Sequence, residues 1–212
     1  MSASRAEKKA QTRQRILDAA LELIADGRSL DSLGLREVAR SAGLAATSLY
    51  NHFSDMDELG LALVDQACFR LRTRMREGRR ELIFAAPEAA IDAMVERFLA
   101  YLADHEAEFR VLVRQRLGHS SRYRRRIHRE LQLLVEELAE DVRGVVDQRL
   151  GLPVDVLSEA EAAVAVMFGF AILALDVPTS QRRRRLPHLK TQLQMIFLGG
   201  RALAAGVRLS EG

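Results

Sequence analysis

Residues 35–53 read Leu-Arg-Glu-Val-Ala-Arg-Ser-Ala-Gly-Leu-Ala-Ala-Thr-Ser-Leu-Tyr-Asn-His-Phe, and this stretch has the pattern of a helix-turn-helix. Val38 and Ala39 place apolar side chains on one face of a first helix, and Gly43 suits the sharp turn that follows it. A second short helix is predicted from Ala46 to Phe53. The stretch therefore predicts two short helices joined at a tight corner.

The second helix is predicted to have two different faces. At roughly 100° per residue, Leu49 and Phe53 fall on the inward face, and small polar side chains fall on the opposite face. Such a helix can enter the major groove of DNA, where residues near its N-terminus reach base edges. The alternative is an ordinary helical hairpin within an all-α core, which has no reason to expose Thr47, Ser48 and Asn51.

Several short motifs carry a resemblance to a known family. They are Arg36-Glu37-Val38-Ala39, Ala42-Gly43, Leu49-Tyr50-Asn51-His52-Phe53 and Asp57-Glu58-Leu59. In spacing and position they resemble the DNA-binding domain of TetR-type repressors. Residues 35–40 and 53–61 resemble more narrowly the members that govern unsaturated fatty-acid synthesis, the FabR and DesT type.

This resemblance implies a set of DNA contacts and a partner, a palindromic double-stranded operator bound by a homodimer. The residues expected to contact DNA are Arg13, Arg36, Ala46, Thr47, Ser48, Tyr50, Asn51 and His52. Thr47 is expected to read bases, whereas Tyr50 and His52 are expected to hold phosphates. Many TetR-type proteins have a lysine near position 57 that meets a phosphate. Here Asp57 is acidic, which removes one expected contact.

Composition excludes several other classes of protein. The chain has 212 residues and a net charge of only +3, so charge alone does not indicate nucleic-acid binding. Cys68 is the single cysteine, which excludes an internal disulfide, and no metal site or cofactor is expected. The longest apolar run, residues 162–175, is shorter than the ~20 residues that span a bilayer. We therefore expect a cytoplasmic protein without a membrane partner.

The chain is predicted to be all-α and to form two domains. Residues 1–54 are expected to form a three-helix DNA-binding domain with the helix-turn-helix, and residues 55–212 a larger helical domain for ligand binding and dimerisation. Helices are predicted over 4–26, 34–42, 46–53, 55–80, from Pro87, 106–117, 121–150, 158–176 and 187–207. Arg182 to Arg185 is interpreted as a loop.

Two helices near the C-terminus indicate self-association. The helix over 158–176 is apolar nearly all round, so it must be covered on every side. The last helix offers small residues for close helix approach, among them Gly199 and Gly200. Together they resemble the pair through which TetR-type proteins dimerise. The alternative is a fully internal helix in a monomer.

Large apolar side chains in the second domain suggest a ligand pocket. The candidate ligand-binding residues are Met94, Phe98, Tyr101, Phe109, Leu112, Arg116 and Met167. The resemblance to fatty-acid regulators implies a channel for an acyl chain, with Arg116 near the phosphates of a coenzyme A or acyl-carrier-protein thioester. The alternative is that the apolar side chains form plain core.

Catalysis finds little support in the sequence. The five histidines lie on different segments without a carboxylate or nucleophile at diagnostic spacing, so we expect no enzyme. The sequence indicates instead a repressor of unsaturated fatty-acid metabolism whose operator affinity depends on a long-chain acyl thioester. One alternative is a TetR-type regulator of an efflux or catabolic operon with another hydrophobic ligand. Another is a helical scaffold or acyl-carrying protein that does not recognise DNA.

Overall fold

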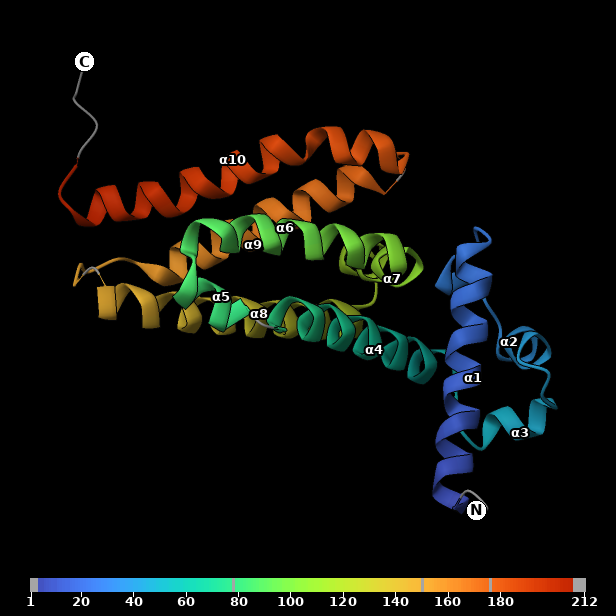
Figure 1. Ribbon diagram of the computed structural model, residues 1–212. Coiled ribbons are helices and arrows are strands. Elements are labelled where there is room, and N and C mark those ends of the chain that lie inside the picture. The colour runs from blue at the N-terminus through green and yellow to red at the C-terminus, as the bar shows by residue number, and fades with distance from the viewer. Residues whose placement is uncertain (1–3, 78, 150, 176, 208–212) are drawn as a thin grey trace. The chain divides into compact units, whose positions relative to one another are not determined.

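The structure is a computed structural model that describes residues 4–77, 79–149, 151–175 and 177–207 (Figure 1). All regular elements in these residues are helices, which confirms the predicted all-α fold. In chain order they are α1 (Arg5–Ala25), the 3₁₀ helix η1 (Leu30–Ser32), α2 (Leu35–Ser41), α3 (Ala46–Tyr50), α4 (Met56–Arg76), α5 (Arg79–Ala85), α6 (Pro87–Asp104), α7 (Glu106–Leu117), α8 (Ser121–Arg149), α9 (Val156–Ala174) and α10 (Thr179–Ala204).

The helices form two compact units. The first unit comprises residues 1–69 and 105–127, and the second comprises residues 70–104 and 128–212. Helices α4 and α8 each contribute one part to the first unit and one part to the second. The predicted domain boundary after residue 54 falls within the first unit and stays a prediction.

In the first unit, α1 packs against α2 and α7, and α2 packs against α3. The helix α1 begins as predicted, because the Ser4 hydroxyl accepts a hydrogen bond from the Glu7 amide and the Glu7 carboxylate accepts one from the Ser4 amide. Its inward stripe is buried at Ile16, Leu17, Ala20 and Ile24. This core fixes α2 and α3 beside α1.

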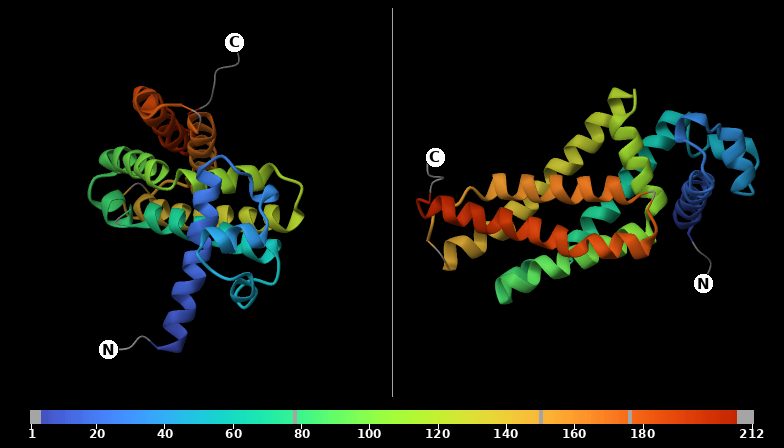
Figure 2. Two further views of the ribbon diagram at one scale, coloured as in Figure 1. Left: turned by 90° about the vertical axis from the view of Figure 1, so that its right-hand side faces the viewer. Right: turned by 90° about the horizontal axis from the view of Figure 1, so that it is seen from above.

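In the second unit, α9 and α10 run side by side, and α6 packs against both α5 and α10 (Figure 2). The buried side chains are mainly apolar and include Met94, Phe98, Leu138, Met167, Leu193 and Phe197. Burial of such side chains supplies most of the stabilisation of a helical core. Helices α5, α6 and α10, with parts of α4 and α8, line the cavity described below.

Two interpretations of the sequence are wrong in the second unit: the loop over Arg182 to Arg185, and the start of the last helix at Pro187. The segment Arg182 to Arg185 is part of α10, which begins eight residues before Pro187 at Thr179. Arg182 is buried, and it donates hydrogen bonds to the backbone oxygens of Val177 (2.7 Å) and Leu175 (3.2 Å). These bonds satisfy two backbone carbonyls at the α9–α10 turn. Arg182 is therefore a buried structural residue and not part of an exposed loop.

Smaller differences concern helix ends. The separate helix α5 was not predicted, and α3 ends at Tyr50 rather than at Phe53. The helix α9 begins two residues early because Asp155 is its cap. The Asp155 carboxylate accepts hydrogen bonds from the Ser158 amide (3.1 Å) and hydroxyl (2.7 Å).

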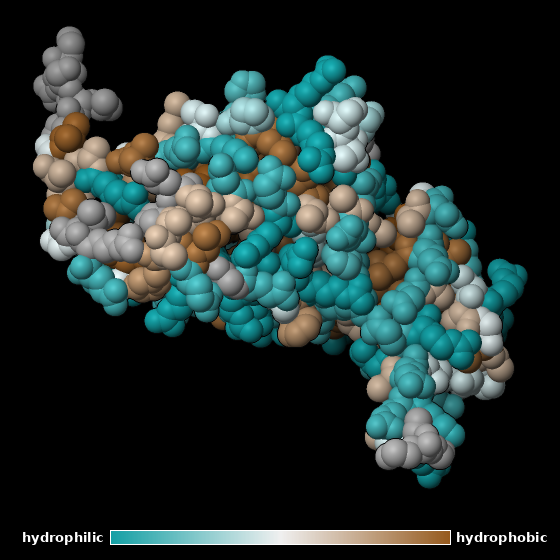
Figure 3. All heavy atoms as spheres, viewed as in Figure 1, coloured by the Kyte–Doolittle hydropathy of each residue, from teal (hydrophilic) through white to brown (hydrophobic). Residues whose placement is uncertain are grey.

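The helix α9 carries apolar side chains on its outer side as well as its inner side. Leu173 is 61% exposed and Ile172 is 44% exposed, and on α10 Met195 and Leu198 are 67% and 62% exposed. Figure 3 shows brown hydrophobic residues among the teal ones at the surface. By length and composition α9 is apolar enough to cross a membrane, but core helices of soluble proteins pass the same test.

Candidate nucleic-acid interface and ligand cavity

The corner between α2 and α3 has the geometry of a helix-turn-helix. Gly43 has a φ of +64°, a left-handed conformation that glycine adopts without steric cost. The amide of Leu44 donates to the Ala39 oxygen over 2.8 Å, which closes the turn. Arg15 on α1 donates from Nη2 to the Ala42 oxygen (2.9 Å) and so caps the C-terminal end of α2. The predicted turn at Gly43 is therefore fixed by backbone and side chain together.

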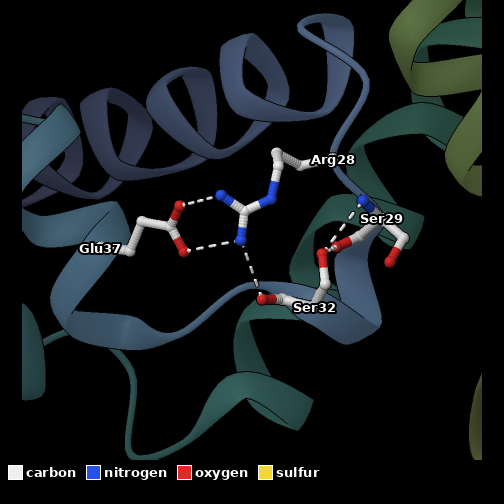
Figure 4. Close-up of polar contacts among 4 residues, drawn as sticks. All are labelled: Arg28, Ser29, Ser32 and Glu37. Atoms are coloured by element: carbon white, nitrogen blue, oxygen red, sulfur yellow. Dashed lines mark hydrogen bonds and ion pairs between the residues drawn. The ribbon is translucent and has the colours of Figure 1, made fainter.

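The start of α2 is held by the segment that follows α1. Figure 4 shows the Arg28 guanidinium facing the Glu37 carboxylate, with Nη1 to Oε1 at 2.5 Å and Nη2 to Oε2 at 3.3 Å. Arg28 Nη2 also donates to the Ser32 oxygen (3.2 Å). Gly34 offers no side chain to cap α2, as the sequence indicates. This two-point contact supports the first turn of α2 in its place.

The helix α3 has the two faces that the sequence predicts. Leu49 and Phe53 are completely buried, whereas Thr47 and Asn51 are exposed and Tyr50 is 51% exposed. Within the described residues, the side chains of these three polar residues form no hydrogen bond. The face of α3 that points away from the core is therefore free to bind another molecule.

Arg13 on α1 lies beside the turn that follows α3. Its guanidinium lies over the Phe53 ring, 4.8 Å from the centroid. Partial burial, with the charges of Lys9 and Arg13, lowers the pKa of the adjacent His52 below its ordinary value. His52 is therefore neutral near pH 7 and acts there as a hydrogen-bonding group, while Arg13 and Lys9 supply the positive charge.

The eight residues predicted to contact DNA all belong to the first unit. Arg13 comes from α1, Arg36 from α2, and Ala46, Thr47, Ser48, Tyr50, Asn51 and His52 from α3 and the turn after it. Arg36 is exposed, and Ala46, Ser48 and His52 are half-buried. Their contacts with DNA stay predictions, but the fold brings them to neighbouring elements.

The start of α4 is capped by acidic groups. The Glu58 amide donates to Asp55 Oδ1 (2.8 Å), and the Glu58 carboxylate accepts from the Ser54 amide (2.7 Å) and hydroxyl (2.9 Å). These hydrogen bonds from Ser54 lower the pKa of Glu58, which favours its ionised form. This cap ends the turn after α3 and begins the helix that leaves it.

The second unit contains a cavity of about 260 Å³. Its apolar lining comes from α4, α5, α6, α8 and α10 and includes Met75, Leu82, Ile83, Ile91, Leu138 and Phe197. Of the predicted ligand-binding residues, Met94 contributes to this lining. Three arginines, Arg79, Arg97 and Arg201, also line it. The cavity therefore offers an apolar interior with positive groups in its wall.

The other predicted ligand-binding residues lie elsewhere. Phe98 and Met167 share with Met94 a second cavity of only about 20 Å³. Tyr101 is buried in the second unit, while Phe109 and Leu112 are buried in the first. Arg116 is exposed on α7. None of these last four lines the larger cavity, and their role in ligand binding stays a prediction.

Sequence reasoning missed the three arginines of the larger cavity. The available signal was position, since Arg97 follows Met94 by three residues in α6 and Arg201 follows Phe197 by four in α10. Residues so spaced share a helix face. Arg79 gave no such signal, because the separate helix that it begins was not predicted.

Comparison with known proteins agrees with this geometry. Residues 16–63 match the family model of the bacterial regulatory proteins of the tetR family. The chain is similar to a tetR-family transcriptional regulator from Streptomyces coelicolor (20% identity, TM-score 0.66, 97% of this chain and 84% of that chain covered). It is also similar to a TetR-like transcriptional regulator from a Rhodococcus species (18%, 0.65, 93% and 100%) and to the fatty acid degradation regulator FadR from Bacillus halodurans (16%, 0.60, 98% and 99%).

At these identities the solved structures show a shared fold, whereas the family match covers the helix-turn-helix itself. Residues 16–63 therefore resemble the DNA-binding segment of tetR-family regulators, and the solved structures add a shared fold over nearly the whole chain. The resemblance to TetR-type repressors is thereby confirmed. The narrower resemblance to FabR and DesT stays a prediction.

Proposed function

We propose that this TetR-family regulator is a homodimeric repressor of fatty-acid metabolism genes, those of unsaturated fatty-acid synthesis above all. It binds a palindromic operator, and a long-chain acyl thioester sets its operator affinity. The proposal depends on the observation that one chain has both an exposed polar face on α3 and a mainly apolar cavity of about 260 Å³ in the second unit.

The size of the cavity limits how a thioester binds. Ligand pockets usually measure about 300 to 1,000 Å³, so this cavity, at about 260 Å³, lies just below that range. It accommodates the acyl chain, and the coenzyme A or carrier-protein headgroup then lies at its opening to solvent. A regulator of fatty acid degradation shares this fold, at 16% identity.

The exposed apolar side chains of α9 and α10 support the homodimer. Leu173 and Met195 are each more than 60% exposed, on two helices that lie side by side. Covering them with a second copy removes apolar surface from water. Two copies also supply the two reading helices that the half-sites of a palindrome need, about one DNA turn or ~34 Å apart.

The test is operator affinity with and without acyl thioesters. Operator affinity would be measured by fluorescence anisotropy with DNA from upstream of the protein's own gene, at fixed salt. The titration would be run alone and with stearoyl- or oleoyl-coenzyme A, whose chains have equal length. We expect specific binding that each thioester changes, with at least a fivefold difference between the bent and the straight chain, about 1 kcal/mol of coupling. Operator binding that neither thioester alters contradicts the fatty-acid role and favours the efflux or catabolic alternative. No specific DNA binding contradicts the whole proposal.

A further inference from the structure

The larger cavity of the second unit has an unusual wall for an apolar ligand. Arg79, Arg97 and Arg201 reach it from α5, α6 and α10, and Gln194 is the other polar residue of its lining. Among the residues that the structure describes, no aspartate or glutamate lines the cavity. Apart from these three arginines and Gln194, the lining consists of aliphatic and aromatic residues.

Arg79 is the most deeply buried of the three, at 5% exposure. Its Nε donates to Asp141 Oδ2 on α8 over 2.7 Å, so its charge has a partner. Its Nη2 is also buried but has no hydrogen-bond partner within the described residues. A buried donor without a partner is unfavourable.

Arg97 and Arg201 have no hydrogen-bonded carboxylate like that of Arg79 among the described residues. Arg97 donates from Nη1 to the backbone oxygen of Glu77, a bond that brings no negative charge. Arg201 has a buried Nε without a hydrogen-bond partner. The Glu159 carboxyl lies near Arg201, but neither of its oxygens forms a hydrogen bond in the described part of the chain. The cavity wall therefore carries two partly buried arginines without a hydrogen-bonded carboxylate among the described residues.

We propose that this cavity binds an amphiphile with one anionic end, whose apolar chain lies among Met94, Leu138 and Phe197 and whose anionic oxygens are held by Arg97 and Arg201. Arginine binds carboxylate and phosphate oxygens through paired N–H donors, so a fatty carboxylate and the phosphates of an acyl thioester share the required chemistry. The inference rests on the proposed function only in that it names the class of its effector. Binding itself is measured without DNA.

Isothermal titration calorimetry with three ten-carbon probes distinguishes the contribution of the anionic group to binding from that of the apolar chain. Decanoate carries a carboxylate, decan-1-ol is a neutral chain of the same length, and decanoyl-coenzyme A places the charge on phosphates. We expect decanoate or decanoyl-coenzyme A to bind at least tenfold more tightly than decan-1-ol. Tighter binding of decanoate identifies the carboxylate as the anion, whereas binding of decanoyl-coenzyme A alone identifies the phosphates. Equal affinities for all three, or no binding, overturn the proposal.

Substitutions of the lining residues test whether the anionic group binds in this cavity. Arg97→Gln and Arg201→Gln should each weaken the charged probe at least fivefold and leave decan-1-ol within twofold. Arg184→Gln, an exposed arginine of α10 outside the lining, is the matched control and should change nothing. Ala90→Phe, which fills the cavity, should weaken all probes. Full affinity of the charged probe in both arginine variants, with their helical content intact by circular dichroism, overturns the site.

The two proposals fail in different ways. Decanoate that binds through the arginines but leaves operator affinity unchanged upholds the site and contradicts its role as effector site. Thioester that changes operator affinity in wild type and in Arg97→Gln/Arg201→Gln alike upholds the regulator and overturns this site.

Discussion

The hydroxyl of Tyr123 on α8 donates a hydrogen bond to Asp57 Oδ1 in the first turn of α4, over 3.2 Å. Tyr123 is buried, and this burial together with the charge of Asp57 holds the pKa of its phenol well above the ordinary value. Gly60 lies against the same ring, where a β-carbon would approach Cζ to 2.8 Å. Asp57, acidic where many TetR-type repressors have a phosphate-binding lysine, therefore has a partner inside the protein.

Tyr123→Phe should destabilise the fold modestly. The variant keeps the ring but removes the donor, so a loss of about 1 kcal/mol in the free energy of unfolding is expected. Gly60→Ala should cost more, because the ring must move from the added methyl group. Urea denaturation measures both. Tyr50→Phe is the matched control, since its exposed hydroxyl has no partner among the described residues, and equal stability of all three with wild type contradicts the role of Tyr123.

The local features of the first unit could be predicted from the sequence. The Ser4 to Glu7 capping box, the Asp55 cap and the turn at Gly43 depend on residues three or four positions apart. Such contacts form wherever the local pattern is present. The inward side chains of α3 follow likewise from helical periodicity.

The missed features depend on contacts that the local pattern does not contain. Arg182 looks like a solvated charge in a run of four arginines, but its place at the α9–α10 turn lets it bind two backbone oxygens. The cavity needs residues from five helices, so large apolar residues alone did not reveal which of them surround it. Phe109 and Leu112, expected there from size, are buried in the other unit.

Thr47→Ala should relax sequence preference at the operator. The side chain is exposed near the start of α3 and has no partner in the described protein, so removing its interaction with a base edge should cost about 1 to 3 kcal/mol at one base pair per half-site. Tyr50→Phe should weaken all sequences alike, because its expected partner is phosphate. Anisotropy with the operator and a point-mutated operator measures the difference. Unchanged discrimination by Thr47→Ala would refute the assignment.

A charge on the outer side of α9 or α10 should dissociate the homodimer. Leu173→Glu and Met195→Glu each place a carboxylate on an exposed apolar position, where burial against a second copy without a partner costs on the order of several kcal/mol. Both variants should sediment as monomers and lose specific operator binding. Arg183→Glu is the matched control on α10, since Arg183 is exposed in the first turns of that helix, away from Met195. Intact dimers in both test variants would place the interface elsewhere.

Glu159 and Gly200 form a very close contact between α9 and α10. Glu159 is 4% exposed, both its carboxylate oxygens lack hydrogen bonds within the described residues, and a β-carbon on Gly200 would lie 2.8 Å from its Cδ. Burial raises the pKa of Glu159 from 4.5 to about 7, although the nearby Arg201 opposes the rise. The absence of a side chain at position 200 is what lets this carboxyl fit.

Glu159 should make stability depend on pH. Between pH 4.5 and about 7 the folded chain holds a proton that the unfolded chain has lost, so the free energy of unfolding falls as pH rises and stays low above 7. Glu159→Gln has nearly the same shape and cannot ionise. It should therefore flatten this slope and gain about 3 kcal/mol over wild type at pH 8 relative to pH 4.5. Urea denaturation at one fixed protein concentration from pH 4.5 to 8 measures it, because dimer stability depends on concentration. Glu161→Gln, on the exposed side of α9, is the control. A wild-type slope retained in Glu159→Gln would assign the pH dependence to another group.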